Sequence, residues 1–358
     1  MTVPTTVNPT LPRVFLQLKP LSTVQDAQAM LQTAIGVEFG TLPPYLYALY
    51  SIRPGTNPQA QQLIKSVALQ EMIHMCLAAN MLNALGGNPV IQPQKYPGPL
   101  PGDIGPNGTP LTLHLYPLSS KAMEQAMAIE QPEDPPDFPV VDLLAAAPAK
   151  AVTIGQFYDA LDCFLKTLPA SDWMAGRNQI VDNQFFAGQL FAVNNYADAH
   201  HAIQDIVSEG EGTREGTKYN PLDFQDEVAH YFRFGEIYYD KVLTKADNPL
   251  GYAWGPAKLG VDWSGVYPAI PDPGIHDFSK DPPAAQSAQN DCNGAFQALV
   301  DSLQLAVTGN QGALGQAVQA MFVLRMTALH AFTVPLADKS QVAGPAFLYN
   351  PSQPGGKS

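Results

Sequence analysis

The sequence contains the pattern Glu-x-x-His twice, each time in a stretch whose apolar residues recur with the period of an α-helix. The first copy runs from Glu71 to His74 and the second from Glu227 to His230. Residues three positions apart share one face of a helix, so each pair can direct two ligand atoms toward one metal ion. A single copy would be weak evidence, because chance produces many. Two copies at equivalent places in two helical hairpins favour a helical bundle built around a metal centre.

The distribution of apolar, proline and glycine residues predicts the layout of that bundle. Helical periodicity predicts four long helices, at about residues 23–52, 58–85, 183–209 and 222–244. A proline-rich insertion, residues 88–182, separates the two hairpins, and a C-terminal extension, residues 245–358, contains two further helices near 284–306 and 311–334. Two hairpins joined by one long crossover are typical of a four-helix bundle. We therefore expect an all-α fold that forms one domain over residues 1–358.

Buried carboxylates are the second sign of a metal centre. Glu38 lies in the middle of an apolar helical stripe, and burying a carboxylate without a partner is costly. Glu38 stands 17 residues before Gly55 and Glu71 stands 16 residues after it, so antiparallel helices joined at that glycine place both at one height. Di-iron bundles combine two Glu-x-x-His motifs with one glutamate from each remaining helix. Glu38 is expected to be the first of these glutamates.

The helix predicted at 183–209 must supply the second lone glutamate. Glu209 and Glu211 flank its apolar face on opposite sides, and the glycines beside them leave the helical phase undecided. Asp205 and His200 are further alternatives. Tyr45 lies one helical repeat after Glu38 and is expected to line the catalytic pocket. Pro43 and Pro44 should kink or break the first helix there.

Several stretches of the chain together resemble a known family. They are Glu38 to Ile52, Glu71 to Gly87, Tyr96 to Pro101, Ile129 to Pro132, Thr153 to Tyr158, Gly210 to Thr213, Glu227 to Phe234 and Ala343 to Phe347. These stretches are similar to the ferritin-like domain family of iminophenyl-pyruvate dimer synthase, which is itself similar to part of the large enzyme of violacein biosynthesis.

That resemblance implies a ferritin-like four-helix bundle and bears on its ligands. The family's loop ends in Gly-Glu-Gly, which favours Glu211 as the ligand, and Glu209 occupies a position that is often glutamine in the family. The metal ligands implied are Glu38, Glu71, His74, Glu211, Glu227 and His230. The family's reaction joins two imines derived from an aromatic amino acid by oxidative coupling.

Composition excludes several other classes of protein. The chain has 32 acidic and 19 basic residues and a net charge of −13, which argues against binding to nucleic acid or to an anionic membrane surface. No run of 18 apolar residues predicts a membrane span, and the segment Met1 to Pro12 lacks the features of a signal peptide. Three widely spaced cysteines, Cys76, Cys163 and Cys292, indicate free thiols in a reducing compartment, which favours the cytoplasm.

The function predicted is that of a di-iron oxidoreductase, with manganese or a mixed metal pair as alternatives. It would use O₂ to oxidise or oxidatively couple a small organic substrate in specialised metabolism, with amino-acid-derived compounds among the candidates. We expect the insertion and the C-terminal extension to cover the open side of the metal site. The alternatives are a non-catalytic ferritin-like protein that binds or stores metal, and a scaffold with a structural metal site. A homo-oligomer is compatible with the sequence.

Overall fold

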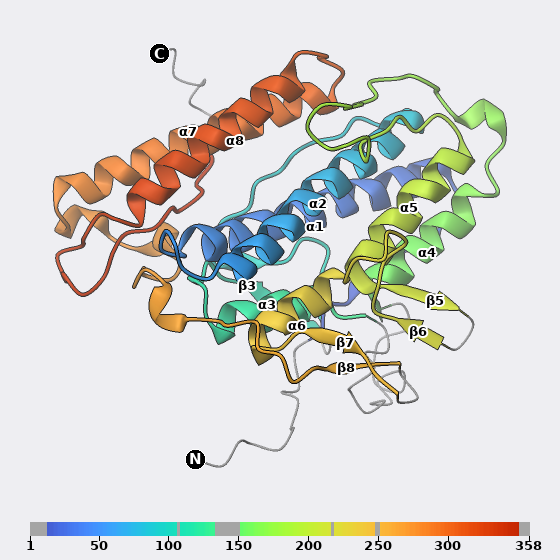
Figure 1. Ribbon diagram of the computed structural model, residues 1–358. Coiled ribbons are helices and arrows are strands. Elements are labelled where there is room, and N and C mark those ends of the chain that lie inside the picture. The colour runs from blue at the N-terminus through green and yellow to red at the C-terminus, as the bar shows by residue number, and fades with distance from the viewer. Residues whose placement is uncertain (1–12, 106–107, 133–150, 216–217, 248–250, 351–358) are drawn as a thin grey trace.

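The computed structural model describes residues 13–105, 108–132, 151–215, 218–247 and 251–350 (Figure 1). Eight α-helices occur among these residues, together with short two-stranded antiparallel ribbons. The all-α prediction is therefore confirmed. The first twelve residues, for which no signal peptide is expected, lie outside the described part of the chain. None of the helices in the described ranges combines the length and the apolar character that a membrane span requires.

A long antiparallel hairpin of α1 (Val24–Tyr50) and α2 (Pro58–Ala84) forms the centre of the fold. Helix α1 begins at a capping box, in which the Thr23 side chain accepts a hydrogen bond from the backbone N–H of Asp26 and the Asp26 carboxylate accepts one from that of Thr23. Helix α2 begins with Pro58, whose missing N–H is not needed in a first turn. The two helices bury most of their apolar side chains, so the predicted first hairpin is confirmed.

The expected break at the two prolines is wrong, because α1 continues through Pro43 and Pro44. A proline leaves the carbonyl four residues earlier without its helical donor. For Pro44 that carbonyl belongs to Gly40, and the hydroxyl of Tyr96 donates a hydrogen bond to it at 2.6 Å. The insertion thus supplies one of the two donors that the prolines remove from the helix.

The second pair of bundle helices is shorter than predicted. Helix α5 spans Tyr196–Glu211 and α6 spans His230–Tyr239. Asn195 caps the start of α5, and the carboxylate of Asp182 binds consecutive backbone N–H groups of a turn further upstream. Asp223 holds the backbone before α6 in the same way. Short polar side chains therefore hold both stretches in loops, although their apolar residues recur with helical spacing.

The crossover between the two pairs contains α3 (Ser120–Ile129) and α4 (Ile154–Leu165). Helix α3 packs against α6, and α4 packs against α5. Both also contact α1, while α2 contacts α5 and α6, so six helices surround the interior where the motifs meet (Figure 1). The insertion is therefore part of the bundle wall and not only a cover.

The remaining elements lie outside this bundle. Helices α7 (Pro283–Val307) and α8 (Ala313–Ala331) form a second hairpin beside α1 and α2, as predicted for the C-terminal extension (Figure 1). The antiparallel ribbons pair β1 (Leu16–Gln17) with β4 (Ala151–Val152), β2 (Gly98–Pro99) with β3 (Thr112–Leu113), β5 (Thr213–Glu215) with β6 (Lys218–Asn220), and β7 (Leu243–Lys245) with β8 (Tyr252–Trp254). These ribbons are only two or three residues long and leave the all-α class unchanged.

Candidate metal centre

Five buried side chains from four helical elements meet inside the bundle. Glu38 comes from α1, Glu71 and His74 from α2, Glu130 from the C-terminal cap of α3, and His230 from the first turn of α6. Within the described residues they form two triads whose potential ligand atoms lie within 4.8 Å of one another. One triad is Glu38, Glu71 and His74, and the other is Glu71, Glu130 and His230. Glu71 belongs to both, so one carboxylate can serve two metal positions.

The two histidines direct the same ring nitrogen at the shared carboxylate. The Nδ1 atom of His230 lies 3.0 Å from Oε1 of Glu71 and 3.6 Å from Oε2 of Glu130. The Nδ1 atom of His74 lies 3.7 Å from Oε1 of Glu71 and 3.8 Å from Oε2 of Glu38. The two imidazole rings stack with centroids 5.6 Å apart. The two histidines therefore bracket Glu71, one for each triad.

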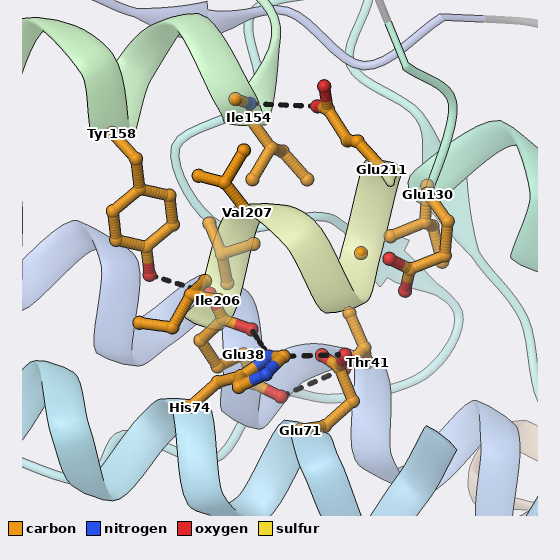
Figure 2. A pocket seen from close by; sticks show the side chains of 14 residues that line it. Glu38, Thr41, Glu71, His74, Glu130, Ile154, Tyr158, Ile206, Val207 and Glu211 are labelled. Atoms are coloured by element: carbon orange, nitrogen blue, oxygen red, sulfur yellow. Dashed lines mark hydrogen bonds and ion pairs between the residues drawn. The ribbon is translucent and has the colours of Figure 1, made fainter. Parts of the chain in front are cut away.

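Each carboxylate of the cluster accepts a hydrogen bond from a hydroxyl group. Tyr158 of α4 donates to Glu38 at 2.6 Å and Thr41 of α1 donates to Glu71 at 3.0 Å (Figure 2). The Tyr45 hydroxyl lies 2.5 Å from Glu130. A hydrogen bond to a buried carboxyl group fixes the direction in which its oxygens point. The three carboxylates are thus held in position before any ion binds.

The five side chains of the cluster include three carboxyl groups and no lysine or arginine. The pKa values of Glu71 and His74 are raised as a result. Burial, together with the nearby carboxylates of Glu130 and Glu38, raises the pKa of Glu71 to about 8. Burial alone would lower the pKa of His74, but its hydrogen bonds to Glu209 and Glu38 raise that pKa well above the ordinary value. Protons therefore supply the missing positive charge in the metal-free protein. Divalent cations would displace those protons and supply the charge instead.

One buried atom supports a metal site directly. Among the described residues, Nδ1 of His230 is buried and has no hydrogen-bond partner of acceptable geometry, although two carboxylates face it. An orphaned polar atom of this kind is costly unless an ion or water satisfies it. The donor set of carboxylate oxygens and imidazole nitrogens suits iron and manganese. The residues present therefore fit a pair of divalent metal ions.

Comparison with known proteins gives the same fold. A family model described as Ferritin-like matches residues 31–239, which is more than half of the chain. The chain belongs to the ferritin-like family. A crystal structure of a ferritin-like protein from Caulobacter vibrioides superposes with a TM-score of 0.62 at 23% sequence identity, covering 93% of this chain and 100% of that one. None of the curated proteins matches the chain in sequence.

In this ferritin-like protein, four of the six ligands predicted from the sequence converge: Glu38, Glu71, His74 and His230. The side chain of Glu227 does not reach the cluster. It precedes α6, is 62% exposed, and lies 3.0 Å from Nη2 of Arg233. The loop held by Asp223 turns this glutamate outward, so the placement of the second Glu-x-x-His motif on one helical face is wrong.

Glu211 lines the cavity beside the cluster, but its carboxylate turns toward α4. It accepts a hydrogen bond of 2.8 Å from the backbone N–H of Gly155, in the first turn of α4 (Figure 2). Glu209, the alternative, has Oε2 at 2.8 Å from Nε2 of His74. Because α5 remains helical to Glu211, residues 209 and 211 differ by about 200° around its axis. Only Glu209 can then face α2.

Glu130 was not among the residues predicted as ligands. It belongs to the insertion, which was expected to lie outside the bundle. The stretch Ile129 to Pro132 was one of those that carried the family resemblance, and that was the available signal. Glu130 occupies the position beside His230 that Glu227 was expected to fill.

A small cavity of about 30 Å³ adjoins the cluster in this ferritin-like bundle. Its lining comes from α1, α2, α5, the end of α3 and the start of α4, and includes Ile129, Tyr158 and Val207. A larger groove of about 300 Å³ lies between α4 and α5 and shares Gly155, Val207 and Glu211 with the cavity. The insertion therefore helps to cover the cluster, as expected. Among the described residues, no part of the C-terminal extension lines the cavity. The expectation that this extension covers the open side of the metal site is therefore wrong.

Proposed function

We propose that this ferritin-like protein is a di-metal oxidoreductase that holds two iron ions, with manganese or a mixed pair as the alternatives. The observation that carries the proposal is the pair of buried triads that share Glu71. Glu38 and His74 would hold one ion, Glu130 and His230 the other, and Glu71 would bridge them. Two iron ions bound there would supply the redox chemistry that reduces O₂ and oxidises a substrate.

The chain's own residues orient the site and limit access of water. The hydroxyl groups of Tyr158 and Thr41 hold Glu38 and Glu71 in fixed directions. Tyr45 was expected to line the catalytic pocket. Its hydroxyl donates a hydrogen bond to Glu130, so we propose that Tyr45 positions the Glu130 carboxylate. The cavity beside the cluster has room for molecules the size of water or O₂. A site of this small size suits chemistry in which few water molecules may approach the metal ions.

A small organic substrate needs more room than that cavity offers. The groove between α4 and α5 is about 300 Å³ and meets the cavity at Val207 and Glu211. We place the substrate in this groove. The resemblance to iminophenyl-pyruvate dimer synthase favours an imine or another compound derived from an amino acid, and a role in specialised metabolism. The three cysteines, all within the described residues, are free, which suits a reducing compartment such as the cytoplasm.

Oxygen consumption tests the proposal. The protein is purified free of metal and loaded anaerobically with two equivalents of Fe²⁺. O₂ uptake is then followed with and without aromatic 2-imino acids generated in situ by an amino acid oxidase. We expect two bound ions and catalytic O₂ uptake above the background of the oxidase reaction. If two ions bind but O₂ uptake stops after the stoichiometric oxidation of iron, the protein is a metal-binding or scaffold member of the family. If no metal binds, the metal centre itself is wrong.

A further inference from the structure

The outer nitrogens of the two cluster histidines have different partners. Nε2 of His74 lies 2.8 Å from a carboxylate oxygen, Oε2 of Glu209. Nε2 of His230 lies 3.1 Å from an amide oxygen, Oε1 of Gln70. Gln70 immediately precedes Glu71 on α2 and is buried. The two triads therefore differ in the group that stands behind each imidazole, one group being an anion and the other neutral.

The rest of the two triads is closely matched. Among the described residues, each triad contains the shared Glu71, one further glutamate and one histidine that directs Nδ1 inward. Each further glutamate is held by a tyrosine hydroxyl, Glu38 by that of Tyr158 and Glu130 by that of Tyr45. Because these features are equal, the partner of the imidazole is the main chemical difference between the two positions.

Arg233 determines which end of the Gln70 amide faces His230. A guanidinium group only donates hydrogen bonds, so the atom of Gln70 that lies 2.7 Å from Nη1 of Arg233 must be the oxygen. The same oxygen faces Nε2 of His230, which must therefore carry a hydrogen. In the neutral imidazole, the lone pair is then on Nδ1, directed at Glu71 and Glu130. Arg233 thus sets the tautomer that a metal ligand needs.

Arg233 is itself firmly held. It is 3% exposed, Nη1 also donates to Oγ of Ser66 at 2.8 Å, and Nε donates to the backbone carbonyl of Val228. Its Nη2 atom lies 3.0 Å from Oε2 of Glu227. The glutamate of the second Glu-x-x-His motif is therefore linked to the cluster indirectly, through Arg233 and Gln70 to His230.

We propose that Gln70, oriented by Arg233, makes the His230 position the weaker of two unequal metal positions, and that Glu209 makes the His74 position the tighter one. The proposal rests on the di-metal site proposed above. An imidazole whose outer N–H faces a carboxylate is a more basic ligand than one whose N–H faces a neutral amide. An ion held at the weaker position would be the more electrophilic of the two.

Calorimetric titration of the metal-free protein with Co²⁺ tests this inequality. We expect two equivalents of Co²⁺ to bind with separate affinities. His230→Ala should retain only the tighter equivalent and His74→Ala only the weaker one, which assigns each affinity to a position. If wild type binds fewer than two ions, the di-metal function fails. If it binds two ions with equal affinity, or if the two alanine variants assign them in the opposite order, the proposed inequality alone is overturned.

Two nearly isosteric exchanges then test the cause. Glu209→Gln should weaken the tighter equivalent and Gln70→Glu should strengthen the weaker one, each by about 10- to 100-fold, the range seen when an outer partner of a ligand is changed. Both changes narrow the gap between the two affinities. If the ratio of the two Co²⁺ affinities stays the same or increases in both variants, the proposal is overturned.

Variants of Arg233 test the same cause independently, in case Gln70→Glu folds poorly. Arg233→Met removes one of the groups that orient the Gln70 amide and should weaken Co²⁺ binding at the His230 position more than at the His74 position. Arg233→Lys keeps a donor and should restore much of the affinity of the His230 position. Circular dichroism and the thermal midpoint of each metal-free variant establish whether it is folded. A merely structural role for Arg233 would lower both affinities together, and that outcome contradicts the proposal.

Discussion

The Oε1 atom of Glu71 lies 3.0 Å from Nδ1 of His230, and both residues are buried. This contact joins the long α1–α2 hairpin to the short helix α6. It also joins the two triads, because Glu71 belongs to each of them. Loss of the Glu71 charge should therefore affect both metal positions, whereas loss of any other carboxylate of the cluster should affect one.

The first prediction is a difference in metal stoichiometry. Glu71→Gln should reduce the bound metal from two ions to fewer than one, while Glu130→Gln should leave one. Both changes keep the shape of the side chain and remove one negative charge from the cluster. Elemental analysis of dialysed, iron-loaded protein measures the outcome. Glu227→Gln is the matched control and should retain two ions, because that side chain is 62% exposed. If Glu227→Gln binds fewer than two ions, Glu227 is a ligand after all, as the sequence predicted.

The second prediction concerns the hydroxyl groups that hold the carboxylates. Tyr158→Phe should lower the free energy of unfolding of the metal-free protein by about 1.5–3 kcal/mol, because a buried charged group loses its hydrogen bond. Tyr349→Phe removes a hydrogen bond to Asp301 nearer the surface and should cost less, about 0.5–1.5 kcal/mol. Urea unfolding followed by circular dichroism compares the two variants. Equal losses would mean that Glu38 does not depend on Tyr158.

The third prediction is that the metal-free protein loses stability as the pH rises. Burial and the neighbouring carboxylates raise the pKa of Glu71 from 4.5 to about 8, so the folded state binds this proton more tightly than the unfolded state. That contribution is complete below pH 4.5 and is lost progressively as the pH rises to about 8. The raised pKa of His74 acts in the same direction.

Metal binding should reverse this trend, because bound ions replace the protons. The thermal midpoint without metal should therefore fall between pH 6 and pH 8, and the increase in midpoint caused by Mn²⁺ should grow over the same range. Glu71→Gln removes the titrating group and should flatten the slope of the metal-free protein. A metal-free midpoint that rises with pH would contradict the assignment of Glu71 as the buried, protonated carboxyl.

The fourth prediction concerns access to the cluster. Val207 lines both the small cavity and the groove between α4 and α5. Val207→Trp should obstruct the junction and slow the uptake of Co²⁺ severalfold without changing the final stoichiometry. Val207→Ala should leave uptake as fast as in wild type or faster. Stopped-flow absorbance of the Co²⁺ complex follows the rate. If the tryptophan variant loads at the wild-type rate, ions reach the cluster by another path.

The sequence by itself determined the helical class, the α1–α2 hairpin and four residues of the cluster. Glu38, Glu71 and His74 lie on long helices, where a regular period of 3.6 residues relates every side chain to the apolar face. The nearly equal spacing of Glu38 and Glu71 from Gly55 is enough to place these two glutamates at one height of an antiparallel hairpin. His230 was found through its motif, although the helix it belongs to begins at that residue and not before it.

Only the tertiary structure decided which other groups face the cluster. Glu130 reaches it because the crossover helix α3 packs against α6, a contact between segments far apart in the chain. Glu209 and not Glu211 faces His74 because α5 stays helical past Gly210, which the glycine-rich sequence left undecided. Glu227 turns outward because Asp223 holds the preceding backbone in a loop. Periodicity describes one element at a time, whereas these three outcomes depend on where elements end and how they pack against each other.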